Sequence, residues 1–285
     1  MSQSAPISSI GKVSILETLG KGAHSTIFRV LREEDSRDYA LKVVPIETDE
    51  DRKFLDQAKH EIKVSQLLNH RNCIKVHCLE TEGLFRVKKA KLLIEYVHGK
   101  TLDQVKLLGV PKLLRVFTQV ADGLAHMHKK GVYHADMKPN NVMLSRATVK
   151  ILDYGLSWIK GESKDRVQGT PKYIAPETVT HKLVNERTDI FNFGVTMYRL
   201  VTLQFPPRIT PNEDGLGMTE EIYNDQLVPV KDHNKGCPQP LAELIESCIQ
   251  FKATARPEMM SEIQGRLDRL ADKFGASEDP EDWND

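Results

Sequence analysis

Short apolar runs separated by polar turns fill the first part of the chain. Three such runs occupy 13–19, 26–31 and 39–45, with a glycine-containing turn after the first and the polar segment 33–38 after the second. Apolar runs of this length between turn residues are typical of β-strands. The pattern therefore predicts three consecutive antiparallel strands.

A helical spacing replaces this pattern in the next segment. Apolar residues recur three or four positions apart across 54–67, and either Thr48 or Asp49 can cap a helix there. Two more strand-like runs follow at 74–79 and 90–97. The segment therefore predicts one main helix beside a sheet of about five strands.

The pattern changes again after Gly99. Thr101 can cap a short helix, and the apolar residues of 112–129 lie at the spacing of a long helix. Two short strand-like runs at 142–144 and 149–152 precede a remainder that is mainly helical. This part of the chain therefore predicts a larger, mostly helical body.

Together these elements predict an α+β fold with two lobes. The chain passes from the β-rich part to the helical part near residues 97–100. We expect a flexible N-terminus at 1–12, a small β-rich lobe with one main helix at 13–97, a larger mainly α-helical lobe at 98–274 and an acidic tail at 275–285.

The composition fits a globular chain with a sizeable core. The 285 residues are 40% apolar, and 40 basic residues balance 40 acidic ones. A neutral total argues against a histone-like nucleic-acid binder, because neutralising phosphates requires a basic surplus, so we expect no nucleic acid as a partner. The segment 272–285 holds six acids and one lysine, so the other 271 residues carry a net charge of +5.

Cysteine usage and the lack of a recognisable signal peptide or membrane span favour a cytoplasmic protein. The N-terminus has no basic segment followed by an apolar one, and no apolar run approaches the roughly 18 residues of a membrane span. The cysteines form no CxxC pair, which favours reduced, buried thiols over disulfides or a metal site. They are Cys73, Cys78, Cys237 and Cys248.

Two weak motifs lie in the β-rich part. Gly-Lys-Gly-Ala-His-Ser-Thr-Ile at 20–27 joins the first two strands, and glycines allow a backbone to approach phosphates closely. Taken alone, a glycine-rich hairpin of this kind is more often purely structural. Lys42 stands in the apolar third strand, where it either extends to the surface or pairs with a carboxylate such as Glu61.

Three motifs in the second part are more specific. His-Ala-Asp-Met-Lys-Pro-Asn-Asn at 134–141 places a carboxylate, a cation and an amide on one loop. Asp-Tyr-Gly at 153–155 adds a second carboxylate after a strand, and two oxygen ligands of this kind suit Mg²⁺. The third motif is Gly-Thr-Pro-Lys-Tyr-Ile-Ala-Pro-Glu at 169–177.

In this order and spacing, the five motifs resemble the signature set of the eukaryotic-like (Hanks-type) serine/threonine protein kinases. The resemblance covers about 13–274, and 169–177 is similar to the serine/threonine branch. It implies a bilobal protein-kinase-like fold and transfer of the ATP γ-phosphoryl group to Ser/Thr hydroxyls of protein substrates. The implied cofactors are ATP and Mg²⁺, with Mn²⁺ as a substitute, and a regulatory partner or a dimer stays open.

The resemblance also implies a nucleotide-binding set. Lys42 would contact the α- and β-phosphates and pair with Glu61, while Ile94 stands at the gatekeeper position. The backbone of Glu95 and Val97 would bind the adenine edge. The full implied set is Gly20, Lys21, Gly22, Ala23, His24, Ser25, Ile27, Ala40, Lys42, Glu61, Ile94, Glu95, Val97 and Met143.

The implied catalytic residues lie in the later motifs. Asp136 would accept or orient the proton of the substrate hydroxyl, Lys138 would stabilise the γ-phosphoryl group, and Thr170 would contact Asp136. Asn141 and Asp153 would hold the metal ion. In structural roles, Glu177 would pair with Arg256, and Asp189 would anchor the catalytic loop.

The chain departs from the family pattern at several positions. Ala135 replaces an arginine that in the family binds an activation-loop phosphate, and Arg166 stands where that phosphate commonly sits. We therefore hypothesise activity without activation-loop phosphorylation. Ser65 replaces an apolar residue behind the main helix, which would loosen that helix. Thr101 and Asn140 stand where kinases that prefer basic substrates often carry acids, so we expect no strong demand for arginine before the phosphoacceptor.

Two alternatives belong to other classes. A pseudokinase serving as a nucleotide-binding scaffold usually lacks at least one catalytic residue, whereas this chain has them all. A kinase-like enzyme acting on a small molecule lacks the Ala-Pro-Glu segment found at 175–177. Both are therefore weaker than an active protein kinase.

Overall fold

The computed structural model describes residues 7–22, 24–106, 108–145, 148–162, 168–209 and 217–275. Ala23, Arg166, residues 1–6 of the predicted flexible N-terminus and the predicted acidic tail beyond residue 275 lie outside the described residues. Two compact units divide the chain. Unit 1 comprises Met1–Asn69, Cys73–His98 and Asp153–Gly155, and unit 2 comprises His70–Asn72, Gly99–Leu152 and Leu156–Asp285.

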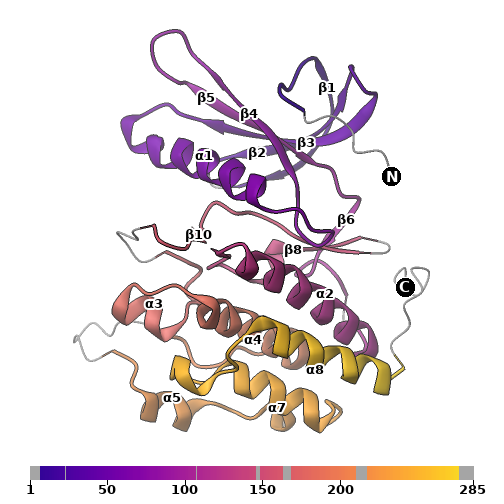
Figure 1. Ribbon diagram of the computed structural model, residues 1–285, viewed down its shortest axis with the longest axis vertical. Coiled ribbons are helices and arrows are strands. Elements are labelled where there is room, and N and C mark those ends of the chain that lie inside the picture. Colours follow the sequence, from indigo (N-terminus) through magenta and orange to yellow (C-terminus); the bar gives the residue numbers. More distant parts are fainter. Residues whose placement is uncertain are drawn as a thin grey trace. The chain divides into compact units, whose positions relative to one another are not determined.

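Unit 1 is built on a five-stranded antiparallel sheet (Figure 1). All five strands expected in this part of the chain are present. In spatial order they are β1 (Val13–Lys21), β2 (Thr26–Arg32), β3 (Arg37–Pro45), β5 (Lys89–Glu95) and β4 (Val76–Glu82).

Alternating side chains give this sheet two apolar faces. Leu92 and Leu93 are adjacent on β5 and both fully buried, yet they belong to different clusters, because successive side chains of a strand point to opposite faces. Helix α1 (Arg52–Leu67) covers the Leu92 face with Leu55 and Ala58. The chain enters α1 through a 3₁₀ turn at Asp49–Asp51, and Thr48, one of the two predicted caps, stands at the N-cap of this turn.

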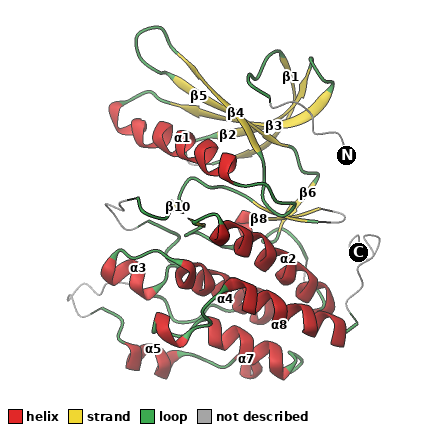
Figure 2. Cartoon of the chain, in the orientation of Figure 1, coloured by secondary structure: helices red, strands yellow, loops and turns green. Residues whose placement is uncertain are grey.

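Unit 2 is mainly helical, and Figure 2 shows its helices in red. Helix α4 is buried over most of its length, which fits the long apolar helix of a domain core. Helix α2 packs along α8, and α4 packs along α7. The helices are α2 (Val110–Lys129), α3 (Pro176–His181), α4 (Glu186–Thr202), α5 (Glu220–Gln226), α6 (Val230–His233), α7 (Gln239–Cys248) and α8 (Met260–Lys273).

Two small sheets carry the loops of unit 2. One has the order β6 (Gly99–Thr101), β8 (Val142–Ser145) and β9 (Val149–Ile151), and the other pairs β7 (Val132–Tyr133) with β10 (Trp158–Ile159). The predicted short helix after Thr101 is wrong. Thr101 pairs with Met143 in the first sheet, so its backbone ends a strand and the chain turns there.

The described residues support two further statements about the chain. None of their helices combines the length and the apolar character needed to cross a lipid bilayer. All four cysteines are buried free thiols, as their spacing predicted. The expected α+β fold, with a small β-rich part before a larger helical part, is confirmed.

Candidate active site

A buried ion pair lies at the centre of unit 1. Lys42 on β3 approaches Glu61 on α1 with 2.7 Å between Nζ and Oε2, and the Asp153 carboxylate lies 3.9 Å from the same ammonium. Burial opposes the charged form of Lys42, but the two carboxylates outweigh it and raise the pKa of this lysine. Lys42 therefore stays positively charged, and it forms the predicted ion pair with Glu61.

Helix α1 is fixed to the sheet by the hydroxyl of Ser65. Ser65 is fully buried one turn after Glu61, and its Oγ accepts the Val76 N–H at 2.7 Å and donates to the Val76 carbonyl at 3.4 Å. Hydrogen bonds to β4 thus stand in the place of the apolar contact expected at this position. Since Ser65 and Glu61 are one turn apart on the same helix face, these bonds also hold Glu61 toward Lys42.

The glycine-containing segment forms the hairpin between β1 and β2. Gly22 donates its N–H to the Ser25 carbonyl at 2.8 Å. His24 stacks on Phe54 of α1, with ring centroids 3.9 Å apart. The hairpin is thereby attached to α1, while a Cβ at Gly20 would meet nothing within 4 Å. The backbone next to Gly20 is open to the close approach of a ligand.

The predicted apolar contacts of the nucleotide share one face of the sheet. Register pairs Ile27 with Lys42 and Ala40 with Ile94, and Ala40 lies two residues from Lys42. Directly paired residues point to the same face, so these side chains line the surface that carries Lys42. Ile27, Ala40 and Ile94 are only half-buried.

The remaining residues of the predicted nucleotide set lie at strand ends. The Glu95 N–H donates to the Lys75 carbonyl at 2.8 Å. A backbone hydrogen bond between Glu95 and adenine would therefore use the Glu95 carbonyl oxygen as the acceptor. Val97 follows β5 and is half-buried, as is Met143 on β8 of unit 2. Their predicted contacts with adenine stay predictions.

In unit 2, the loop after β7 and the segment at 169–177 bring three predicted catalytic residues together. Lys138 Nζ lies 2.6 Å from Asp136 Oδ2 and 2.6 Å from Thr170 Oγ1. Thr170 donates both its N–H, at 2.8 Å, and its hydroxyl, at 2.7 Å, to Asp136 Oδ1. The Asp136 side chain is 7% exposed. The network therefore holds a carboxylate of which only a small part reaches solvent. We call these residues the Asp136 triad.

Asn141 completes the surroundings of Asp136 and presents an oxygen. Its Nδ2 donates to the Asp136 backbone carbonyl at 2.8 Å and lies 3.3 Å from Asp136 Oδ2. Because both amide protons point to Asp136, the amide oxygen is oriented away from it.

The donors predicted for Mg²⁺ are chemically suitable. They are one amide oxygen at Asn141 and one carboxylate at Asp153, and hard oxygen donors of this kind are what Mg²⁺ prefers. Asp153 is half exposed and adopts a left-handed backbone with φ 59°. Among the described residues, no three His, Cys, Asp or Glu side chains gather as a metal cluster.

Asp189 of α4 holds the loop that precedes the triad. Its two oxygens accept the N–H groups of His134, at 2.8 Å, and Ala135, at 2.7 Å. Ala135 has φ 63°, a left-handed conformation that costs about 1–2 kcal/mol in a residue other than glycine. The two bonds maintain this strained turn, and the anchoring role predicted for Asp189 is confirmed at the level of its contacts.

The electrostatics of Asp189 depend on a residue that the sequence analysis missed. Burial alone would raise the pKa of Asp189, but the hydrogen bond from His128, at 2.8 Å, and nearby positive charge lower it. His128 precedes Asp189 by 61 positions, so no local spacing connects them. The helical periodicity of 112–129 placed His128 on the predicted helix, but it indicated no partner for the imidazole.

Ala135 itself belongs to an apolar cluster. Its methyl packs with Tyr133 and Val184, and Trp158 packs against the same group. Trp158 pairs with Tyr133 across β7 and β10, with ring centroids 5.9 Å apart, and donates its Nε1–H to the Glu162 carbonyl. The start of the segment after Asp153–Gly155 is therefore attached to unit 2 by apolar contacts.

The end of that segment is held by a buried ion pair. Glu177 and Arg256 form two hydrogen bonds of 2.9 and 3.0 Å, and the Arg256 side chain is fully buried. This pair was predicted and is confirmed. Bidentate geometry of this kind adds directional precision to the charge attraction.

The chain is similar to one protein family and to several of its members. A family model described as protein kinase domain matches residues 13–266. A Clostridium acetobutylicum protein named probable serine/threonine-protein kinase is 28% identical over 272 residues, which are 92% of this chain and 40% of the relative. Arabidopsis thaliana CBL-interacting serine/threonine-protein kinase 8 is 32% identical over 69% of this chain and 45% of its own. Mouse serine/threonine-protein kinase D3 is 28% identical over 89% of this chain and 29% of its own. The chain therefore spans less than half the length of each of these relatives.

Proposed function

Because the chain belongs to the protein kinase domain family, we propose that it transfers the γ-phosphoryl group of ATP to serine and threonine hydroxyls of protein substrates. The observation that carries this proposal is the Asp136 triad with Asn141. Phosphoryl transfer requires mainly positioning and charge neutralisation, and this network positions one carboxylate beside one cation.

The residues of the proposed site have separate tasks. Asp136 orients the acceptor hydroxyl and takes up its proton, while Lys138 balances negative charge on the transferred group. Thr170 keeps Asp136 and Lys138 in register. Lys42, kept charged by Glu61, binds the α- and β-phosphates.

Metal and nucleotide binding follow from the donors. Asn141 and Asp153 would hold Mg²⁺, or Mn²⁺ in its place, and the metal would neutralise phosphate charge when bound. Gly20, Ile27, Ala40 and Ile94 would contact the nucleotide, because they border the surface that carries Lys42. Four buried free thiols support a reducing, cytoplasmic location.

Activity without activation-loop phosphorylation is part of the proposal. The position where the family usually has a phosphate-binding arginine is Ala135, and its side chain lies in an apolar cluster with Tyr133 and Val184. An apolar group gives a phosphate no counter-charge. Instead of a phosphate, the pairing of β10 with β7 fixes the start of the segment that follows Asp153–Gly155.

A transfer assay tests the proposed function. The protein is incubated with γ-labelled ATP, Mg²⁺ and casein, and Asp136→Ala is treated in parallel with nucleotide binding measured for both. We expect labelled casein with the wild type and at least 100-fold less with the variant, because the variant lacks the orienting carboxylate. Equal nucleotide binding without transfer by the wild type would establish the pseudokinase alternative.

A further inference from the structure

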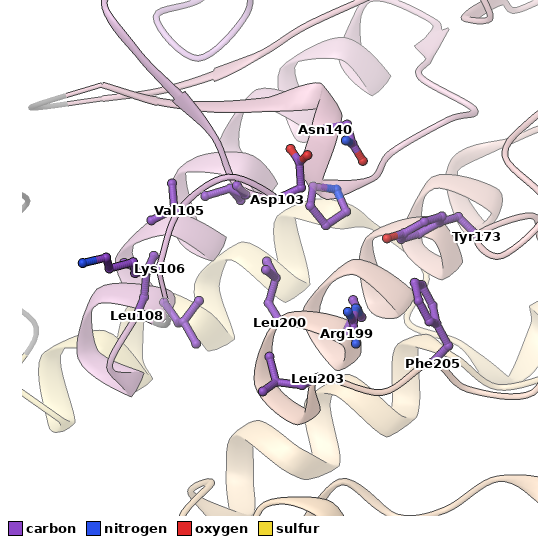
Figure 3. A pocket seen from close by; sticks show the side chains of 13 residues that line it. Asp103, Val105, Lys106, Leu108, Asn140, Tyr173, Arg199, Leu200, Leu203 and Phe205 are labelled. Carbon is purple, nitrogen blue, oxygen red and sulfur yellow. The ribbon is translucent and has the colours of Figure 1, made fainter.

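A pocket of about 330 Å³ lies in unit 2 (Figure 3), and its wall includes residues close in sequence to the Asp136 triad. Pro139 and Asn140 in its wall directly follow Lys138, and Tyr173 in its wall comes three residues after Thr170. The Tyr173 N–H also donates to the Thr170 carbonyl at 2.8 Å. The pocket therefore shares both chain segments with the triad, so its occupant would lie next to the acceptor hydroxyl.

One end of this pocket is lined by Arg199 and Phe205, and a second cation, Lys172, contacts the Phe205 ring from outside the lining. Arg199, near the end of α4, places its guanidinium carbon 4.9 Å from the centroid of the Phe205 ring, and Lys172 Nζ lies 4.6 Å from the same centroid. Tyr173 contacts that ring edge-on at 5.5 Å. Figure 3 shows Arg199, Tyr173 and Phe205 grouped together.

The charge at this end has no counter-ion within the described part of the chain. Neither Arg199 nor Lys172 has a carboxylate oxygen within 4.0 Å there, and Arg199 is half-buried. The acid in the pocket wall, Asp103, lies beside Asn140 in Figure 3 and apart from Phe205. Both cations lie within 5 Å of one ring centroid, at 4.6 and 4.9 Å, so they are closer to each other than one Debye length, roughly 10 Å at 0.1 M salt, and both attract an anion bound at Arg199.

We propose that this pocket binds the carboxylate of an aspartate or glutamate near the phosphoacceptor of the protein substrate, with Arg199 as the residue that selects it. This inference rests on the proposed kinase function and adds a substrate class to it. A guanidinium matches a carboxylate through two parallel hydrogen bonds. Apolar side chains in the rest of the wall reduce the competition from water; they include Leu113, Leu200 and Leu203.

The chemistry of the wall also excludes the opposite preference. In the wall, Asn140 is uncharged, and a basic substrate side chain at the Phe205 end would meet Arg199 and the nearby Lys172. Like charges brought together at short distance lower affinity. The Phe205 end of the pocket therefore disfavours arginine and lysine as well as selecting acids, while the one acid named in the wall, Asp103, lies apart from that end.

Peptide kinetics test this inference. Each peptide has one serine, and glutamate or glutamine is placed in turn at each of about four positions on either side of it. For one position, we expect the wild type to prefer glutamate about three- to tenfold in kcat/KM, through KM and with unchanged kcat. The preference should fall as salt rises, because an exposed ion pair is screened.

Variants assign the preference to Arg199. Arg199→Gln should phosphorylate glutamate and glutamine peptides equally while its rate on the glutamine peptide stays within about twofold of wild type. Arg199→Glu should prefer lysine at the same position, and this reversal cannot come from a folding defect. Lys129→Gln is the matched control, because Lys129 is an exposed cation on α2 about 24 Å along the helix from Leu113.

The outcomes separate the two proposals. Equal rates on glutamate and glutamine peptides at every position, with wild-type activity intact, would overturn the acidic pocket and leave the kinase function standing. Loss of the preference in Lys129→Gln would do the same, because a general charge effect would then explain it. No labelling of any peptide above the Asp136→Ala background would overturn the kinase function and the pocket together.

Discussion

The charged side chains that the chain buries most deeply are held by partners of suitable charge. They are Glu61, Asp136, Glu177, Asp189 and Arg256. A buried charge costs several kcal/mol unless an opposite charge and hydrogen bonds compensate it. The contacts of Asp136, which receives donors from Lys138, Asn141 and Thr170, therefore hold the carboxylate in one orientation.

The hydroxyl of Thr170 gives the first prediction. Thr170→Val removes the bond to Asp136 and the acceptor for Lys138 but keeps the shape of the side chain. We expect kcat to fall about 10- to 100-fold, because small displacements of catalytic groups are costly. Thr170→Ser restores the hydroxyl and should recover most of the rate in the same assay. A Thr170→Val enzyme with wild-type kcat would show that the hydroxyl has no positioning role.

Asp189 gives a prediction about pH. Its pKa in the folded chain lies below the ordinary value of 3.8, so its contribution to the free energy of unfolding is complete above that value and is lost as pH falls through the folded pKa. Asp189→Asn should therefore lower stability by about 3–5 kcal/mol at pH 7. The difference from wild type should shrink below about pH 4.

Urea unfolding across this pH range measures the effect. Asp225→Asn serves as the control, since Asp225 is exposed on α5 and its loss should change stability by less than about 0.5 kcal/mol. A difference between wild type and Asp189→Asn that stays constant down to pH 2 would contradict this account of Asp189.

At this scale, the sequence predicted residues that lie in ordered motifs and missed those connected only by the fold. Lys138 is two positions from Asp136, so the motif itself implied their contact. His128 and Arg199 carry no local signal, because their partners come from other elements. Their contacts depend on how α2 and α4 pack in the fold.

At the scale of elements, apolar periodicity predicted the strands of unit 1 and helices α1 and α2 well. The error after Thr101 has a physical cause, since a capping residue and a strand end are equally compatible with threonine. Pairing of Thr101 with Met143, a contact across 42 positions, decides between them. Non-local backbone pairing of this kind leaves no trace in a short sequence window.

Ser65 provides the prediction for helix α1. Ser65→Ala leaves the N–H of the buried Val76 without its hydroxyl acceptor, so the free energy of unfolding should fall by about 1–3 kcal/mol. Activity should fall with it, because α1 carries Glu61. Ser247→Ala is the control, since that hydroxyl donates only within α7, at 2.7 Å, and its removal should cost less than about 0.5 kcal/mol. Equal stability losses in the two variants would contradict the attachment of α1 through Ser65.

At the scale of the whole molecule, the neutral total charge conceals an uneven distribution. Residues 1–271 carry +5 and residues 272–285 carry −5. A mildly basic body suits a protein that handles polyphosphates, because the summed charge attracts anions. The composition argues against a histone-like nucleic-acid binder but indicates no substrate class; the proposed acidic substrate rests on the pocket in unit 2.

Treatment with a phosphatase tests the regulation proposed for the whole enzyme. After complete dephosphorylation, the protein should keep its kcat within about twofold, because the Ala135 cluster offers a phosphate no counter-charge. Mass spectrometry before and after treatment confirms that phosphate was removed. Loss of most turnover, with recovery on rephosphorylation, would show that a phosphate elsewhere in the chain controls activity.

The most direct test of the central claim is the fate of the γ-phosphoryl group. Parallel reactions with γ-labelled and α-labelled ATP, Mg²⁺ and casein are followed by acid hydrolysis and separation of the phosphoamino acids. We predict label in phosphoserine and phosphothreonine from the γ position alone, and at least 100-fold less with Asp136→Ala. Label confined to phosphotyrosine, or none above the Asp136→Ala background, would contradict the assignment.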